Sequence, residues 1–291
     1  MKLRIIDVTP IGERLIASYL LMEGSEALLI DTGPRSTVDR VLEALWEEGV
    51  KPSYIILTHI HLDHAGAAAD IARETGATIL VHPRGAKHVV NPDRLWEASR
   101  AVLGPVADLY GRPNPAPEHL VREAGDGEVL EAGGLRLRII HTPGHASHHM
   151  SIHVEGRGLM FLGDSAGIVI DYMGERVALP STPPPFKPQA YIESVERMIR
   201  LAPSEAAPGH YGTLTDATSY LRGHLDQIKR WMGLVEQALG EGVSDVARVA
   251  EYVADRDGTA SKLYSSSNPV ISQMFYMGTI WGLVEALRGR S

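Results

Sequence analysis

The segment from Thr58 to His64 reads Thr-His-Ile-His-Leu-Asp-His and places four candidate metal ligands within six positions. Three of them are imidazoles and one is a carboxylate: His59, His61, Asp63 and His64. Neutral imidazole and carboxylate are ligands that suit zinc, and also iron or manganese. One histidine in a polar loop says little about function, but three histidines and an aspartate at this spacing predict a metal site.

The residues around this segment indicate how it is positioned. Residues 54–57 are an apolar run of β-forming residues, which predicts a buried strand that ends at the segment. Residues two apart in an extended chain face the same way, so His59 and His61 point into one site. A helical pattern begins at residues 65–72, so Asp63 and His64 turn away and can serve a second site. One strand end therefore supplies ligands for one metal ion or for two.

Three later positions extend the set to a two-metal site. They are His145, Asp164 and His210, and each comes just after an apolar or strand-like segment. His145 and His210 both follow a Pro-Gly pair, which lets the backbone turn sharply toward a ligand. Each position is weak support by itself, but this order after the first segment is a strong indication of metal binding.

The elements that must carry these residues alternate between strands and helices. Strands are predicted near residues 4–8, 16–21, 27–30, 78–81, 135–140 and 158–162, and a helix runs from a cap at Ser36 to Gly49. Further helices are predicted at about 190–201 and from residue 216 to the end. Five prolines make residues 180–188 a stiff loop. Strand, helix and strand form a βαβ unit, and ligands bind at the carboxyl ends of such strands.

With these residues in this order, the chain resembles the metallo-β-lactamase-fold hydrolase superfamily, whose signature is His-x-His-x-Asp-His followed by His, Asp and His. The resemblance covers residues 1 to about 215. It implies an α/β fold, an αββα sandwich of two mixed β-sheets flanked by helices, with the site at one edge. It also implies a catalytic domain at 1–215, and the helical pattern of residues 216–291 predicts a C-terminal helical extension that packs on this domain.

The resemblance also implies how the metals are shared among the ligands. His59, His61 and His145 would hold the first ion, and Asp63, His64 and His210 would hold the second. Asp164 would bridge the two. The ions would be divalent, with zinc as the first expectation and iron or manganese as alternatives.

The predicted chemistry is that of a metal-dependent hydrolase. Two divalent ions that share a water bring its pKa down toward ~7, which supplies hydroxide at neutral pH. We expect this hydroxide to attack an ester, thioester, lactone or phosphoester of a small molecule. Asp63 is the expected catalytic residue, because it would both ligate a metal ion and help to orient the nucleophile.

Further residues have expected roles around the site. Asp31 resembles the family's aspartate that orients a ligating region through hydrogen bonds, although it could also be a simple turn residue before Gly33. Tyr172 and Phe186 could wall an apolar substrate pocket or serve only in packing. His148 and His149 precede a predicted strand at residue 150, so at most one of them faces the metals.

The order of the later ligands looks like the glyoxalase II branch, where thioester hydrolysis is the reference activity. The C-terminal helices show no basic cluster that can be assigned to a glutathione carboxylate. One alternative is a persulfide dioxygenase, an oxidoreductase of the same fold that uses a single iron. Another is a phosphodiesterase acting on small phosphodiesters.

Composition limits the function classes. The 291 residues are 44% apolar, which is ample for a core, and the formal net charge of -8 argues against a surface built for large nucleic acids. There are no cysteines, so a thiolate metal site is excluded. The first residues do not resemble an export signal, and no run approaches the ~18 apolar residues of a membrane span. We therefore expect a cytoplasmic protein with no membrane partner.

Two further expectations concern the source of the protein and its oligomeric state. Asn and Gln total only seven, which hints at a heat-adapted source. Residues 270–281 are apolar nearly all round, so they pack against the sandwich or against a second subunit. We expect a helical cap near the site that contributes to a homodimer contact.

Overall fold

The computed structural model describes residues 1–12, 14–172 and 174–288. The chain divides into two compact units. The first unit comprises residues 1–141, 148–163 and 204–215, and the second comprises residues 142–147, 164–203 and the chain from residue 216 on. One break falls at the predicted boundary after residue 215, but the second unit also includes residues 142–147 and 164–203, which the prediction assigned to the catalytic domain. The predicted division into two domains stays a prediction.

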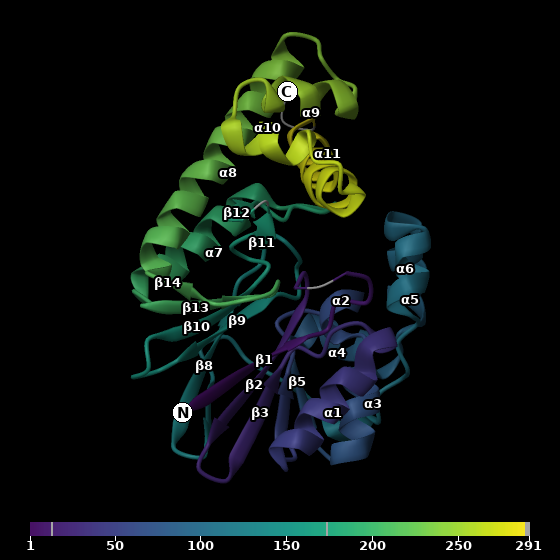
Figure 1. Cartoon of the computed structure of the whole chain (residues 1–291), viewed down its shortest axis with the longest axis vertical. Helices are drawn as coiled ribbons and strands as arrows, with labels where there is room; N and C mark the ends of the chain where they lie inside the picture. The colour runs from purple at the N-terminus through teal and green to yellow at the C-terminus, as the bar shows by residue number, and fades with distance from the viewer. Residues whose placement is uncertain (13, 173, 289–291) are drawn as a thin grey trace. The chain divides into compact units, whose positions relative to one another are not determined.

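The first unit contains a six-stranded mixed sheet whose strands lie in chain order (Figure 1). The strands are β1 (Lys2–Asp7), β2 (Ala17–Glu23), β3 (Glu26–Ile30), β4 (Tyr54–Ile56), β5 (Thr78–Val81) and β6 (Val121–Glu123). β1, β2 and β3 pair antiparallel, and β3 to β6 pair parallel. The central strands β3, β4 and β5 are almost fully buried, as their continuous apolar runs require of parallel strands covered on both faces.

A second six-stranded mixed sheet also belongs to the first unit. Its order is β14 (Leu214–Thr215), β13 (Glu205–Pro208), β10 (Leu159–Gly163), β9 (Met150–Val154), β8 (Leu135–His141) and β7 (Val129–Ala132). In β8 the residues Leu135, Leu137 and Ile139 are buried and alternate with Arg136 and Arg138, so one face of this strand meets a core and the other meets solvent. Only β10 and β13 pair parallel.

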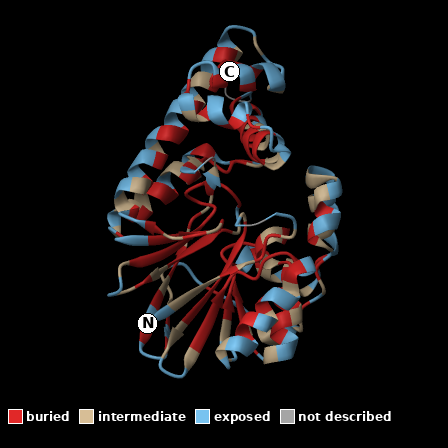
Figure 2. Cartoon of the chain, viewed as in Figure 1, coloured by how far each residue is buried: buried red, intermediate tan, exposed pale blue. Residues whose placement is uncertain are grey.

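The core of the first unit lies between the inner faces of these two sheets. Side chains from both sheets form one buried cluster, in which the Tyr19 and Phe161 rings meet edge to face with centroids 5.5 Å apart. Figure 2 shows the strands as the most continuously buried part of the unit. Two large mixed sheets flanked by helices confirm the predicted α/β fold class.

The helices of the first unit lie in the connections between its strands. They are η1 (Arg35–Thr37), α1 (Val38–Glu48), α2 (Leu62–Ala65), α3 (Ala68–Thr75), α4 (Pro83–Val90), α5 (Asp93–Leu103), α6 (Pro105–Tyr110) and η2 (Glu118–Leu120). The predicted cap at Ser36 is wrong, because Ser36 lies inside η1 and the residue before α1 is Thr37. The predicted end at Gly49 is confirmed.

The second unit is mainly helical. It contains the hairpin β11 (Ile168–Tyr172) and β12 (Glu175–Leu179), then α7 (Pro188–Arg200), α8 (Ala217–Gly240), α9 (Val246–Ala254), α10 (Gly258–Tyr264), the π-helix η3 (Val270–Met277) and α11 (Gly278–Arg288). Trp231 on α8 and Tyr276 on η3 are fully buried, and their ring centroids lie 5.6 Å apart. The Tyr276 hydroxyl donates to the Ala250 carbonyl at 2.7 Å, so these helices share one core.

The C-terminal helical stretch is longer and more apolar than the sequence analysis expected. Among the described residues, the helix Val270–Arg288 has the length and composition of a membrane span, but 56% of the window that qualifies is buried within the protein. A core helix meets the same criteria, so this finding is weak support for a membrane segment.

Candidate metal centre

The predicted metal-binding segment is anchored at its first residue. The backbone N–H of Thr58 donates to Asp31 Oδ1 at 2.7 Å, and the Thr58 hydroxyl donates to Asp31 Oδ2 at 2.7 Å. The Thr58 carbonyl accepts from the N–H of Met150 at 2.7 Å. The chain therefore leaves β4 in a fixed direction, with the His59 side chain fully buried.

Asp31 reaches a second part of the same segment. It is buried, and its Oδ2 lies 3.0 Å from His64 Nδ1. Since a carboxylate accepts, the imidazole donates from Nδ1 and leaves Nε2 to face the other way. One carboxylate thus holds both the start of the segment, at Thr58, and its last candidate ligand.

The single turn of helix α2 carries Asp63 and His64. His61 precedes its first residue in an extended conformation, so the chain changes direction between His61 and Asp63. The His64 carbonyl accepts from the Thr32 N–H at 2.7 Å and from the Thr32 hydroxyl at 2.9 Å. These contacts fix the backbone of the turn as well as its side chains.

Four of the five candidate histidines share one orientation, because each has Nδ1 within hydrogen-bond distance of a protein oxygen. The pairs are His59 with Thr58 Oγ1 at 3.1 Å, His64 with Asp31 Oδ2 at 3.0 Å, His145 with the Ser181 carbonyl at 3.0 Å and His210 with the Leu15 carbonyl at 2.6 Å. An imidazole that donates from Nδ1 presents its Nε2 lone pair to a metal ion.

Two of these Nε2 atoms lie near carboxylate oxygens. His64 Nε2 is 3.6 Å from Asp63 Oδ2, and His145 Nε2 is 3.7 Å from Asp164 Oδ2. Two donor atoms bound tetrahedrally to one zinc ion, with bonds of about 2.0–2.1 Å, would lie roughly 3.3 Å apart. Both distances are long for a direct hydrogen bond and fit two ligands that share one ion.

His210 is carried by the loop that follows β13. The hydroxyl of Tyr19, a fully buried side chain on β2, lies 2.6 Å from the Pro208 carbonyl and 2.8 Å from the Gly212 carbonyl. The same hydroxyl is 3.2 Å from the carbonyl of His210 itself. Tyr19 therefore connects both ends of this loop to β2.

His145 follows a turn that is closely packed by α7. The Gly144 carbonyl accepts from the Lys187 N–H at 3.0 Å, and the Pro143 carbonyl accepts from the Ser194 hydroxyl at 2.7 Å. A Cβ atom at Gly144 would lie 2.4 Å from the Tyr191 Cα, and the φ angle of Gly144 is +135°. Only glycine fits this approach without displacing the turn.

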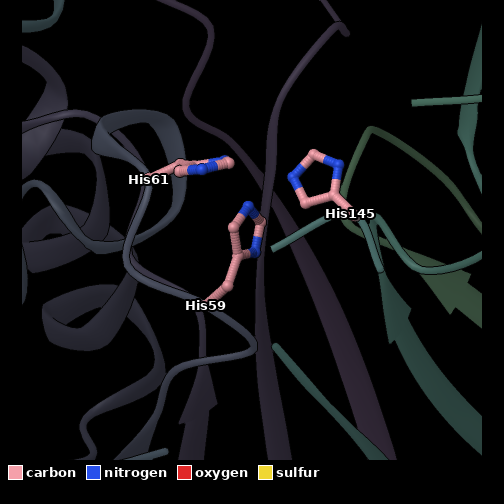
Figure 3. A group of neighbouring side chains, drawn as sticks. All are labelled: His59, His61 and His145. Atoms are coloured by element: carbon pink, nitrogen blue, oxygen red, sulfur yellow. The ribbon is translucent and has the colours of Figure 1, made fainter. Parts of the chain in front are cut away.

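The predicted ligands form three groups whose ligand atoms all lie within 4.8 Å of one another. One group is His59, His61 and His145, drawn in Figure 3. The others are His59, His64 and Asp164, and Asp63, His64 and His210. All seven predicted metal ligands therefore occur in these groups.

Comparison with known proteins places the chain in a family. The sequence profile described as the Metallo-beta-lactamase superfamily matches residues 11–210. The chain belongs to this superfamily. The match confirms the predicted superfamily, while the narrower glyoxalase II-like assignment is not confirmed by it.

Individual relatives agree with this membership. The metallo-beta-lactamase fold-containing protein ST1585 of Sulfurisphaera tokodaii is 32% identical over 228 residues, covering 77% of this chain and 82% of the relative. Its crystal structure aligns over 99% of this chain and 98% of its own, with a TM-score of 0.70 and 25% identity. The atrochrysone carboxyl ACP thioesterase AgnL7 of Paecilomyces divaricatus is 29% identical over 150 residues, which is 51% of this chain and 38% of that protein.

Two further histidines lie close to a predicted ligand of this metallo-beta-lactamase superfamily member. The His149 and His148 rings have centroids 4.9 and 6.4 Å from that of His59, so both approach the same ligand. Both precede β9, which begins at Met150 as predicted, and the expectation that at most one of them faces the metals stays a prediction. Burial lowers the pKa of His148 to about 3, which keeps this ring neutral.

Several other histidines of this superfamily member fall outside the three groups: His82, His88, His119, His141, His153 and His224. His82 accepts the Arg84 N–H at 3.0 Å and so caps α4, and its ring centroid is 4.1 Å from that of His141. His224 Nε2 lies 2.7 Å from the Tyr191 hydroxyl. These contacts of His82 and His224 are structural.

The two residues predicted to wall a substrate pocket differ in their surroundings. Phe186 is buried, and its ring meets that of Tyr191 edge to face at 5.3 Å. Tyr172 is half-buried at the end of β11. The contact of Phe186 is a packing contact, and a role in substrate binding stays a prediction for both.

Proposed function

We propose that the protein is a hydrolase that uses two divalent metal ions, zinc in the first instance, to cleave an ester or thioester of a small molecule. The three overlapping groups of ligand atoms carry this proposal. Membership in a superfamily of mostly hydrolytic enzymes supports it.

The grouping supports an assignment of ligands to two ions. His59, His61 and His145 would hold one ion, and Asp63, His64 and His210 the other. The third group combines Asp164 with one histidine from each of these sets, His59 and His64, as a bridging carboxylate would require. The residue types fit zinc, iron or manganese, since the chain offers only nitrogen and oxygen ligands here.

The residues around the ligands have defined tasks in this proposal. When bound, divalent ions acidify a water and polarise the bond to be cleaved. Asp63 is half-buried, with one oxygen toward His64, so its second oxygen is suited to hold and orient the attacking water. Asp31 keeps the Nε2 lone pair of His64 directed at the site through its contact with Nδ1.

A thioester is the first substrate class to test. One relative is named an acyl-carrier-protein thioesterase, although the likeness covers only half of this chain. The order of the later ligands resembles glyoxalase II, whose reference substrate is also a thioester. We therefore propose a thioesterase-like activity and keep lactones and phosphoesters as comparison substrates.

The test begins with protein stripped of metal and reloaded with zinc, manganese or iron. We expect two ions per chain and hydrolysis of at least one substrate in a panel of thioesters, esters, lactones and phosphoesters. Asp63→Asn should lower the rate by about 100-fold or more. Asp39→Asn, on the exposed side of α1, is the matched control and should leave the rate unchanged.

Other results would point to other functions. Normal hydrolysis with fewer than two ions per chain would contradict the two-metal proposal. One bound iron with oxygen uptake on glutathione persulfide would replace it with the dioxygenase alternative. Cleavage restricted to phosphodiesters would replace it with the phosphodiesterase alternative.

A further inference from the structure

Ser181 contacts two of the predicted ligands at once. Its backbone carbonyl accepts from His145 Nδ1 at 3.0 Å, and its hydroxyl donates to Asp164 Oδ2 at 3.1 Å. The residue is buried, with 6% of its surface exposed. One residue thus fixes the tautomer of an imidazole and the orientation of a carboxylate, the two properties that a metal ligand needs.

The segment Pro180–Thr182, which we call the Ser181 strap, is held on both sides by helix α11. The Thr182 hydroxyl donates to the Thr279 carbonyl at 2.8 Å. The Thr279 hydroxyl donates in return to the Pro180 carbonyl at 2.6 Å. Both threonines are buried, so neither hydrogen bond competes with solvent.

The strap also lies against the helix backbone at Gly282. A Cβ atom at Gly282 would lie 1.4 Å from the Thr182 carbonyl oxygen, so no larger residue fits there. Pro180 begins the strap and Pro183 follows it, and both prolines restrict φ and remove backbone donors. The position of Ser181 is therefore set by α11 and by the stiffness of its own segment.

We propose that Ser181 is a positioning residue for His145 and Asp164, and that helix α11 sets metal affinity through the Ser181 strap. This inference rests on the proposed function in one respect, which is that His145 and Asp164 bind metal. It connects helix α11 to two of the predicted metal ligands through a continuous series of buried hydrogen bonds. Hydrogen-bond partners of metal ligands commonly alter affinity by about 10- to 100-fold.

The test compares zinc affinity in three variants, measured by competition with a chromophoric chelator. Ser181→Ala removes the donor to Asp164, and we expect zinc to bind about 10- to 100-fold more weakly. Ser181→Thr keeps a hydroxyl and should restore most of that affinity. Thr279→Val keeps the helix and removes one of the two hydrogen bonds that tie the strap to it, so it should weaken zinc binding as well.

The controls lose similar hydrogen bonds elsewhere in the second unit. Ser272 is equally buried at 6%, and its hydroxyl donates to the Asn268 carbonyl at 3.2 Å. The Thr218 hydroxyl donates to the Pro203 carbonyl at 2.8 Å. Ser272→Ala and Thr218→Val should lower the melting temperature of the metal-free protein as much as the test variants do, and leave zinc affinity within twofold.

A second measurement determines the tautomer of the His145 imidazole in metal-free protein. Nitrogen-15 NMR should show His145 with its proton on Nδ1 in the wild type, and a mixture of tautomers in Thr279→Val. Zinc affinity within twofold of the wild type in both Ser181→Ala and Thr279→Val would overturn the inference and leave the proposed function standing. A wild-type protein that binds no zinc, manganese or iron would instead overturn the proposed function itself.

Discussion

At the scale of single residues, the metal centre is defined as much by the partners of its ligands as by the ligands. A side-chain or backbone oxygen lies against Nδ1 of His59, His64, His145 and His210. Asp31 has the widest reach of these partners, because it also accepts two hydrogen bonds from Thr58. Ligands that are oriented before metal arrives need less reordering when it binds.

Asp31→Asn tests whether the contact of Asp31 with Nδ1 of His64 orients this ligand. An amide can present its nitrogen to Thr58 or to His64, and either choice replaces an acceptor by a donor. We expect zinc to bind about 10- to 100-fold more weakly, measured by chelator competition. The exposed variant Asp39→Asn should bind zinc like the wild type, and equal affinity in both variants would contradict the role of Asp31.

Tyr19→Phe tests the anchor of the loop that carries His210. The Tyr19 hydroxyl is buried beside the carbonyls of Pro208 and Gly212, and its loss leaves them without this donor. We expect the free energy of unfolding to fall by about 1–3 kcal/mol in urea denaturation. Tyr264→Phe removes a hydroxyl from an exposed ring and should change it by less than about 0.5 kcal/mol.

At the scale of elements, the ends of strands and the turns beside helices deliver the ligands. This much follows from local sequence, since an apolar run before His59 and a Pro-Gly pair before His145 are visible without a structure. Ser181 was not predicted, because its strap is tied to Thr279 by contacts 97 and 99 residues apart. The hairpin β11–β12 was also missed, whereas the strand that begins at Met150 was predicted.

Gly144→Ala tests how α7 positions the turn before His145. The added Cβ atom would meet the Tyr191 backbone at 2.4 Å in a conformation that only glycine adopts readily. We expect loss of about 2 kcal/mol or more of unfolding free energy, together with weaker zinc binding. Gly156 also has a positive φ, +73°, but a Cβ atom there would meet no atom within 4 Å, so Gly156→Ala should cost only about 1 kcal/mol and leave zinc binding unchanged.

The contact between α7 and α8 predicts a dependence of stability on pH. Burial lowers the pKa of His224 to about 3, whereas the ordinary value is 6.5. Between these values the unfolded chain takes up a proton that the folded protein does not. The free energy of unfolding should therefore fall as the pH drops from 6.5 toward 3, by at most about 1.4 kcal/mol per pH unit from this residue.

Replacement of His224 by glutamine isolates its contribution to the pH dependence of the free energy of unfolding. In metal-free protein, urea denaturation from pH 7 to pH 4.5 should give a shallower loss of stability for His224→Gln than for the wild type. His119 is exposed, and His119→Gln should keep the slope of the wild type. Parallel curves for His224→Gln and the wild type would show that the buried ring does not contribute to acid sensitivity.

At the scale of the whole molecule, the C-terminal helices are part of the architecture that this chain shares with ST1585. The superfamily profile ends at residue 210, but the ST1585 structure aligns over 99% of the chain. Within the helical stretch 270–288, Val270, Met274 and Met277 are half-buried and Trp281 is exposed. These four residues are apolar and at least partly exposed, and we call this set of residues the C-terminal stripe.

We propose that this stripe pairs with the same stripe of a second copy, as the sequence analysis expected of a homodimer. An exposed tryptophan within an apolar stripe is the kind of residue that anchors an interface. Sedimentation velocity at micromolar concentration should give twice the monomer mass of 31.6 kDa.

Trp281→Glu places a charge in the stripe and should yield monomers. Trp46, on α1, is 81% exposed, so Trp46→Glu is the matched control and should remain dimeric. A monomeric wild type, or a dimer that survives Trp281→Glu, would contradict pairing through this stripe.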